Sequence, residues 1–145
     1  MEGWGTACAE KCSGRRDSRV KETTRQLFTR ASDAIEAADI LLSNNKADFA
    51  AGRVYYAMFY TAEALLNEKG FQFGKHGNVI GAYGQHFAKT KTLDPKFHRW
   101  LLTSFDIRQI GDYALNPNVE TQVVIQMIDQ AQEFLETAIK YLEGE

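Results

Sequence analysis

Near the centre of the chain the sequence reads Arg53-Val54-Tyr55-Tyr56-Ala57-Met58-Phe59-Tyr60, followed closely by the apolar residues Ala64, Leu65 and Leu66. We predict a helix from about Asp48, a good N-cap, to Lys69, with Gly70 as the residue just beyond its end. At 100° per residue the four aromatic side chains of this segment cover more than half of the helix circumference. The helix is therefore expected to be buried on two sides, as a central helix that also meets a partner chain.

Four further segments have apolar residues at intervals of three and four, which is helical spacing. Three long helices are predicted over about 20–42, 94–114 and 120–143, and a shorter one over about 79–90. Asp94 and Pro95 suit the N-cap and the first helical position. The helix over 94–114 is expected to bury Phe97, Leu101, Leu102, Phe105 and Ile110, and the last helix has the most regular apolar stripe, from Val123 to Leu142.

No segment alternates with period two, and the connections between helices are short. Short connections place consecutive helices antiparallel. The predicted fold is all-α, an up-down antiparallel helical bundle of four long helices plus one shorter helix. Residues 1–18 contain three glycines and two serines without periodicity and are predicted to form a poorly ordered N-terminal tail, so that 19–145 form the bundle domain.

Composition excludes several classes of protein. The net charge is −2, no window approaches 18 uninterrupted apolar residues, and the start lacks the basic and apolar regions of a secretory signal, so we expect a cytoplasmic protein. Cys8 and Cys12 have no second cysteine pair and no nearby histidine, which makes them a poor zinc site. There is no phosphate-binding loop, no dinucleotide fingerprint and no Glu-x-x-His, so neither a metal nor a cofactor is expected.

The charge is uneven along the chain. Residues 11–30 hold seven basic side chains against two acidic ones, whereas 120–145 hold six acidic side chains against one basic. The basic segment could follow a phosphate backbone, or it could be a solvated helix entry.

Two further segments stand out: Phe105-Asp106-Ile107-Arg108-Gln109-Ile110-Gly111-Asp112-Tyr113, and Lys75-His76-Gly77-Asn78-Val79-Ile80. Together with residues 53–60, and in this order, they resemble a HEPN domain (higher eukaryotes and prokaryotes nucleotide-binding). The branch resembled is a stand-alone form found beside minimal nucleotidyltransferases, and the resemblance covers about 20–142. It implies a helical domain that forms homodimers and associates with a minimal nucleotidyltransferase, often as a toxin–antitoxin-like pair.

In many HEPN proteins an R-x(4–6)-H motif carries metal-independent ribonuclease activity. A histidine can take the proton of the ribose 2′-hydroxyl, and an arginine can hold the phosphate. The resemblance places the arginine at Arg108, but Tyr113 stands where the motif has histidine. Tyrosine titrates near pH 10 and is a poor base at neutral pH, so the motif is incomplete.

Other polar residues complete the candidate site. Asp112 lies four residues after Arg108 on the same helix face, which predicts either an ion pair or a ligand- or partner-facing patch. Lys75 and His76 precede a helix N-terminus, where they could hold a phosphate or supply the missing imidazole, or His76 could be an ordinary loop histidine. Arg53 is a further candidate, because it could reach Arg108 or Asp112 across the bundle.

Three functions remain open at the level of sequence. The first, which the incomplete motif favours, is a homodimeric interaction protein that partners a minimal nucleotidyltransferase and has a polar nucleotide- or RNA-facing cleft around Arg108. The second is a metal-independent endoribonuclease that uses Arg108 with Tyr113 or His76. The third is a nucleotide-sensing dimer that binds a mononucleotide without turnover.

Overall fold

A computed structural model describes residues 20–73, 77–115 and 118–144. Within these ranges every regular element is helical: α2 (Glu22–Ser43), α3 (Ala47–Glu68), α4 (Val79–Tyr83), the π-helical segment η2 (Gly84–Ala88), α5 (Lys96–Tyr113) and α6 (Thr121–Leu142). The all-α prediction is confirmed. The predicted tail over 1–18 lies outside the described residues.

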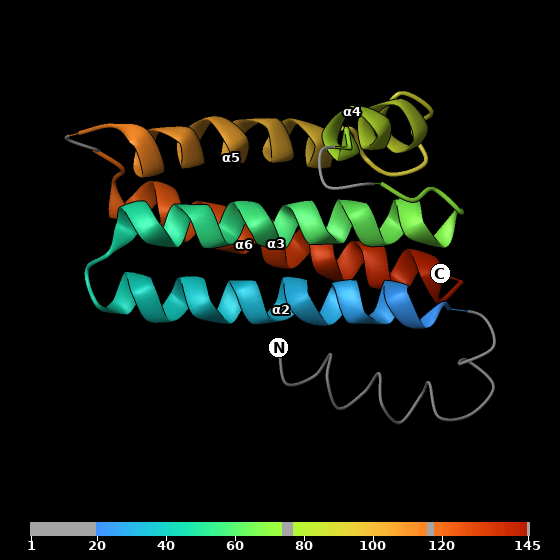
Figure 1. Ribbon diagram of the computed structural model, residues 1–145, viewed down its shortest axis with the longest axis horizontal. Helices are drawn as coiled ribbons and strands as arrows, with labels where there is room; N and C mark the ends of the chain where they lie inside the picture. The colour runs from blue at the N-terminus through green and yellow to red at the C-terminus, as the bar shows by residue number, and fades with distance from the viewer. Residues whose placement is uncertain (1–19, 74–76, 116–117, 145) are drawn as a thin grey trace.

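Helix α3 is the centre of the arrangement. It packs against α2, α5, α6 and α4, whereas α5 and α6 contact each other only weakly. In Figure 1, α3 lies between α2 and α5 with α6 behind it, and each long helix runs opposite to the long helix before it in the chain. The first turn of α2 and the last turn of α3 therefore lie at the same end of the molecule.

The prediction that α3 is buried on two sides is confirmed. Its buried residues are Ala50, Ala51, Gly52, Val54, Tyr55, Ala57, Met58, Thr61, Ala62, Ala64, Leu65 and Leu66. Burial of each large apolar side chain in this set stabilises the fold by about 1.5–3 kcal/mol. The many alanines let neighbouring helices approach α3 closely from several directions.

The end of α3 follows its local sequence signal. Gly70 adopts a φ of 97°, and the next residue, Phe71, donates its N–H to the carbonyl of Leu66, so the predicted C-terminal glycine is confirmed. The start of α5 lies one residue later than predicted: Pro95 occupies the capping position and Lys96 is the first helical residue, while the Asp94 carboxylate accepts a hydrogen bond from the Lys96 N–H at 2.9 Å.

Asp48 is not the N-cap of α3, so that prediction is wrong. The helix begins one residue before it, and the capping position is occupied by Lys46, whose side chain makes no capping bond. Asp48 lies in the first turn, where its negative charge still favours the positive end of the helix dipole. The position of the helix start is set by the turn at Asn45, which has a φ of 63°.

The burial predicted for α5 is partly wrong. Phe97 and Leu101 are buried, but Leu102 is 44% exposed and Ile110 is 49% exposed. The buried face of α5 is a narrow stripe of Phe97, Leu101, Ser104 and Gly111. Because α5 packs mainly on α3 and only weakly on α6, residues 100° away from this stripe remain in solvent.

No helix in the described part of the chain has both the length and the apolar character needed to cross a membrane.

Candidate functional site

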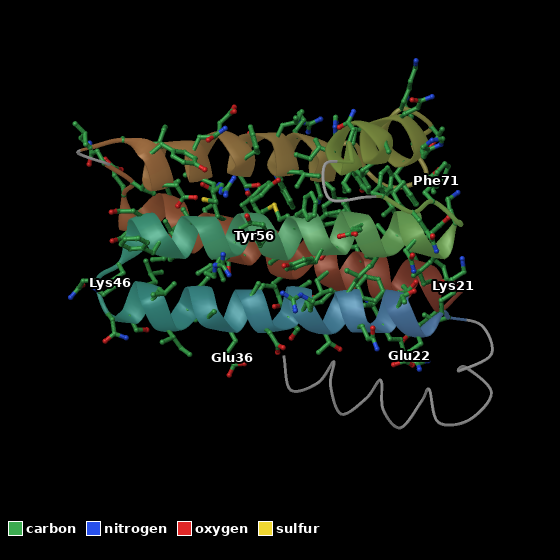
Figure 2. All side chains as sticks on the ribbon, in the orientation of Figure 1. Lys21, Glu22, Glu36, Lys46, Tyr56 and Phe71 are labelled. Carbon is green, nitrogen blue, oxygen red and sulfur yellow. The ribbon has the colours of Figure 1, made fainter. Side chains whose placement is uncertain are left out.

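Arg108 lies on α5 with its side chain directed at α3. The side chain is 19% exposed, and its Nη2 donates a hydrogen bond to the hydroxyl of Tyr56 at 3.1 Å. Tyr56 lies near the middle of α3 (Figure 2). The bond joins residues 52 positions apart in sequence, so the tertiary structure alone creates it.

Two adjacent aromatic rings lie beside the guanidinium group. The Cζ of Arg108 lies 5.5 Å from the ring centroid of Tyr55 and 5.3 Å from that of Tyr56. Arg53 approaches the same Tyr56 ring at 4.9 Å. Two arginines therefore share one tyrosine, an arrangement stabilised by the attraction of cations to the ring faces. Burial raises the pKa of the Tyr55 phenol, and the positive charge of Arg108 opposes part of that rise.

Arg108 also pairs with Asp112, as their spacing predicts. Arg108 Nε and Asp112 Oδ2 are 2.8 Å apart, and the Asp112 side chain is only 29% exposed. The Nε–H does not point at this oxygen and has no hydrogen-bond partner among the described residues, so the contact is mainly an attraction between charges. The pair holds the arginine in place, and the carboxylate offsets part of its positive charge.

Two glycines lie where α5 meets α3, and the close approach depends on one of them. A Cβ atom on Gly52 would lie 3.6 Å from Asp112 Oδ1 and 3.8 Å from Arg108 Cγ, which means that both side chains cross over this glycine. A Cβ atom on Gly111 would lie 2.7 Å from the carbonyl oxygen of Asp48, closer than real atoms approach. The candidate site is therefore built on a close helix contact that requires glycine at position 111.

The structure does not bring Tyr113 to Arg108. Tyr113 is 70% exposed at the end of α5, and no described residue forms a hydrogen bond with its hydroxyl. Lys75 and His76 lie outside the described residues. The two described histidines are elsewhere: the His86 ring lies 4.4 Å from that of Phe71, and the His98 ring lies 6.2 Å from that of Tyr83.

The described residues form no group of three or more His, Cys, Asp or Glu side chains that could hold a metal ion. Around Arg108 the described side chains are guanidinium groups, which can bind an anion, and tyrosine rings.

Sequence reasoning missed the roles of Tyr56 and of the two glycines. A signal for Tyr56 was present, since Arg53, Tyr56, Tyr60, Glu63 and Asn67 recur at intervals of three and four along α3. This polar stripe marks the face of α3 that is not covered by the core. The glycines had no such signal, because a close approach of two helices is visible only in three dimensions.

The HEPN domain family matches residues 24–143 of this chain. The UPF0332 protein of Thermotoga maritima is 34% identical over 114 residues, which cover 79% of this chain and 86% of that protein. The protein named "Putative toxin MJ0142" of Methanocaldococcus jannaschii is 30% identical over 124 residues, covering 86% and 84% of the two chains. The UPF0332 protein glr0978 of Gloeobacter violaceus is 33% identical over 119 residues, covering 81% and 94%. With this match over most of its length, the chain belongs to the HEPN domain family.

Proposed function

We propose that this chain is the HEPN component of a toxin–antitoxin-like pair, acting in the cytoplasm as a homodimer whose partner is a minimal nucleotidyltransferase. The surface around Arg108 faces a nucleotide or RNA ligand. The observation that carries the proposal is the placement of Arg108 beside two adjacent tyrosine rings, with its Nη2 bonded to Tyr56 and its Nε beside Asp112. The toxin name of the Methanocaldococcus jannaschii relative supports the assignment to such a pair.

A guanidinium group held in this way suits a phosphate group. Its orientation is set in advance by contacts within the protein, so little conformational freedom remains to be lost when a ligand binds. Arg53 adds a second positive charge close to the Tyr56 ring. Arginines interleaved with aromatic rings are typical of surfaces that bind single-stranded nucleic acid, because bases stack on the rings.

The end of α5 supports the homodimer. The exposed apolar side chains there are Ile110, Tyr113 and Leu115. Phe49, at the start of α3, is also exposed. This part of α3 lies close to the end of α5, because Gly111 is packed against the backbone of Asp48. Exposed apolar side chains near one another favour burial against another protein surface. A second copy of the chain would cover them and would bring two Arg108 surfaces into one assembly.

The partner is tested by co-expression with the nucleotidyltransferase encoded beside this chain. We expect the two proteins to co-purify, and the chain alone to have the mass of a dimer by light scattering. A monomeric chain that fails to capture the nucleotidyltransferase would overturn this part of the proposal.

The second candidate is a metal-independent endoribonuclease, favoured by the solvent-accessible Tyr113 five residues after Arg108. This candidate function is tested by incubating RNA with the purified chain in a buffer that contains a metal chelator. The variants are Arg108→Ala and, as a control, Arg99→Ala, which removes an exposed arginine from the same helix. If the wild-type protein and the Arg99 variant cleave RNA and the Arg108 variant does not, the chain is a ribonuclease that uses Arg108. If the wild-type protein leaves the RNA intact, the binding function is the one that stands.

A further inference from the structure

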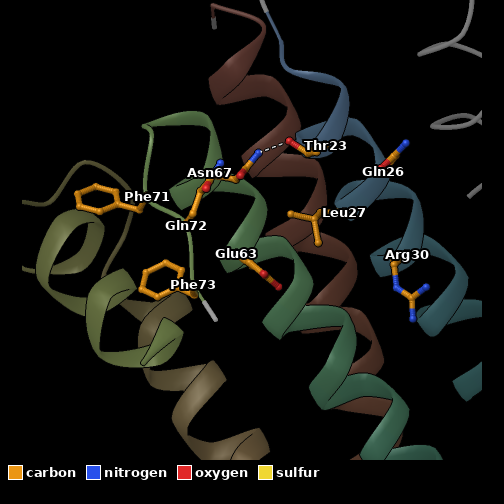
Figure 3. Close-up of a pocket in the computed structure, with 9 residues that line it drawn as sticks. All are labelled: Thr23, Gln26, Leu27, Arg30, Glu63, Asn67, Phe71, Gln72 and Phe73. Atoms are coloured by element: carbon orange, nitrogen blue, oxygen red, sulfur yellow. Dashed lines mark hydrogen bonds between the residues drawn. The ribbon is translucent and has the colours of Figure 1, made fainter. Parts of the chain in front are cut away.

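A cavity of about 350 Å³ lies between α2, the second half of α3 and the segment that follows α3. Its walls include Leu27, Arg30, Glu63, Asn67, Gln72 and Phe73 (Figure 3). The volume is within the range of pockets that hold small molecules. The cavity contains none of the residues placed around Arg108.

Glu63 is the unusual member of this lining. It is partly buried, yet the described residues give its carboxylate neither a hydrogen bond nor an ion pair. Burial raises the pKa of this carboxyl. A partly buried carboxylate that no described residue pairs with is free to accept hydrogen bonds from a ligand in the cavity.

Two of the neighbouring polar groups are already engaged. Asn67 Nδ2 donates to the hydroxyls of Thr23 and Thr24, at 2.6 and 3.0 Å. Arg30 donates to the Tyr60 hydroxyl at 3.2 Å and lies 5.0 Å from the centroid of that ring. Glu63 is the one carboxylate among the residues that line the cavity, so it is the strongest acceptor there, beside the side-chain amides of Gln26 and Gln72.

An acceptor of this kind selects a ligand with N–H donors. In Figure 3, Glu63 lies between Phe73 on one side and Leu27 on the other, so apolar side chains flank the carboxylate. Among the RNA bases, guanine alone presents two adjacent donors, N1–H and the N2 amino group, on its Watson–Crick edge, and both can bind one carboxylate.

A polar path connects the cavity with Arg108. Arg53, Tyr56, Tyr60 and Glu63 form one stripe along α3, and the rings of Tyr56 and Tyr60 are 6.1 Å apart. Arg30 faces this stripe from α2 and borders both the Glu63 cavity and a second cavity, of about 250 Å³, that contains Arg53. Glu63 is seven residues from Tyr56, about 10 Å along the helix axis, so one strand can reach both.

We propose that the cavity is a guanine-reading subsite for single-stranded RNA held at Arg108, in which Glu63 accepts hydrogen bonds from the Watson–Crick edge of the base. This inference rests on the proposed function, because it assumes that the ligand at Arg108 is RNA. Arg108, Arg53 and Arg30 supply the affinity for the backbone, and Glu63 supplies the selectivity for the base.

The test compares short labelled oligouridylates that carry one central guanine, inosine or adenine, by fluorescence anisotropy. The proteins are the wild type, Glu63→Gln and the control Glu36→Gln, which removes an exposed carboxylate from α2. Because the loss of one negative charge strengthens binding of any RNA, the measured quantity is the ratio of dissociation constants between oligomers.

We expect the wild type and the Glu36 variant to bind the guanine oligomer roughly ten-fold more tightly than the adenine oligomer, in line with a paired hydrogen bond to a base edge. Inosine, which lacks the amino group, should give an intermediate value. The preference should disappear in Glu63→Gln while binding of RNA persists. An unchanged preference in that variant, or no preference in the wild type, would overturn the inference and leave the proposed function standing.

The two proposals fail in different ways. If the wild type binds none of the oligomers, the RNA-facing function itself fails and the subsite fails with it. A guanidinium group presents the same pair of donors as guanine, so acetyl-arginine amide is tested as a competitor. Acetyl-arginine amide could bind the wild type but not Glu63→Gln, while the guanine oligomer binds no more tightly than the adenine oligomer. In that case the cavity binds a basic side chain, and its assignment to RNA is wrong.

Discussion

Gly111 on α5 lies directly against the backbone carbonyl of Asp48 on α3, so closely that a Cβ atom at position 111 would be 2.7 Å from the oxygen. This contact sets the distance between the two helices beside the candidate site. It places Arg108 and Asp112, one turn apart, over Gly52.

Gly111→Ala is therefore expected to destabilise the fold. The added methyl group must push the two backbones apart, which costs about 1–3 kcal/mol and outweighs the higher helix propensity of alanine. The measurement is urea unfolding followed by circular dichroism.

Gly52→Ala is the matched control for the same helix pair. Its Cβ atom would meet Asp112 and Arg108 at ordinary contact distances, so the gain in helix propensity, up to about 1 kcal/mol, should dominate. Equal effects of the two substitutions would contradict the close contact at Gly111.

Tyr56→Phe should lower the free energy of unfolding by about 1 kcal/mol, because Nη2 of a largely buried Arg108 loses its acceptor while the ring is retained. Tyr60→Phe is the comparison, since Tyr60 accepts a similar bond from Arg30, which is exposed and can bind water instead. Chemical denaturation of both variants measures the difference. A Tyr60 effect as large as that of Tyr56 would show that burial of Arg108 is not the cause.

Tyr83→Phe should stabilise the protein. Tyr83 is fully buried, its hydroxyl has no hydrogen-bond partner among the described residues, and burial raises the pKa of the phenol well above its ordinary value. Removing an unsatisfied hydroxyl is expected to raise the free energy of unfolding by about 1–3 kcal/mol. The check is the midpoint of thermal unfolding, and a lower midpoint would mean that a buried water molecule satisfies the hydroxyl.

Glu63→Gln should change the dependence of stability on pH. Burial raises the pKa of the Glu63 carboxyl in the folded state, so the folded protein binds this proton more tightly than the unfolded chain does. The charged carboxylate therefore costs stability above the folded-state pKa, and this cost disappears as the pH falls below the ordinary value of about 4.3. We expect the variant to unfold at a higher temperature than the wild type at pH 7, by a modest amount because Glu63 is only partly buried.

The advantage of Glu63→Gln should shrink toward pH 4. Thermal unfolding of both proteins across this range measures it, with Glu36→Gln as the exposed control. A constant difference between Glu63→Gln and the wild type at all pH values would contradict the assigned cause.

Local patterns in the sequence determined the helices. The apolar stripe of the last helix predicted the buried residues Val124, Met127, Ala131, Phe134, Leu135 and Ala138, all of which lie in the core. The aromatic run at 53–60 indicated a helix covered on two sides, and Gly70 marked its end. These features depend on the backbone of one helix and on the period of its side chains, so neighbouring residues in the chain contain the information.

The contacts between helices were decided only by the tertiary structure. The sequence predicted that Arg108 and Asp112 share a face, because that follows from helix geometry, but it did not select Tyr56 as the acceptor or reveal the open carboxylate of Glu63. It also placed Leu102 and Ile110 in a core that α5 does not provide. The physical reason is the same in each case: burial and hydrogen bonding depend on which surfaces meet, and that depends on contacts such as Gly111 with Asp48, between residues far apart in the chain.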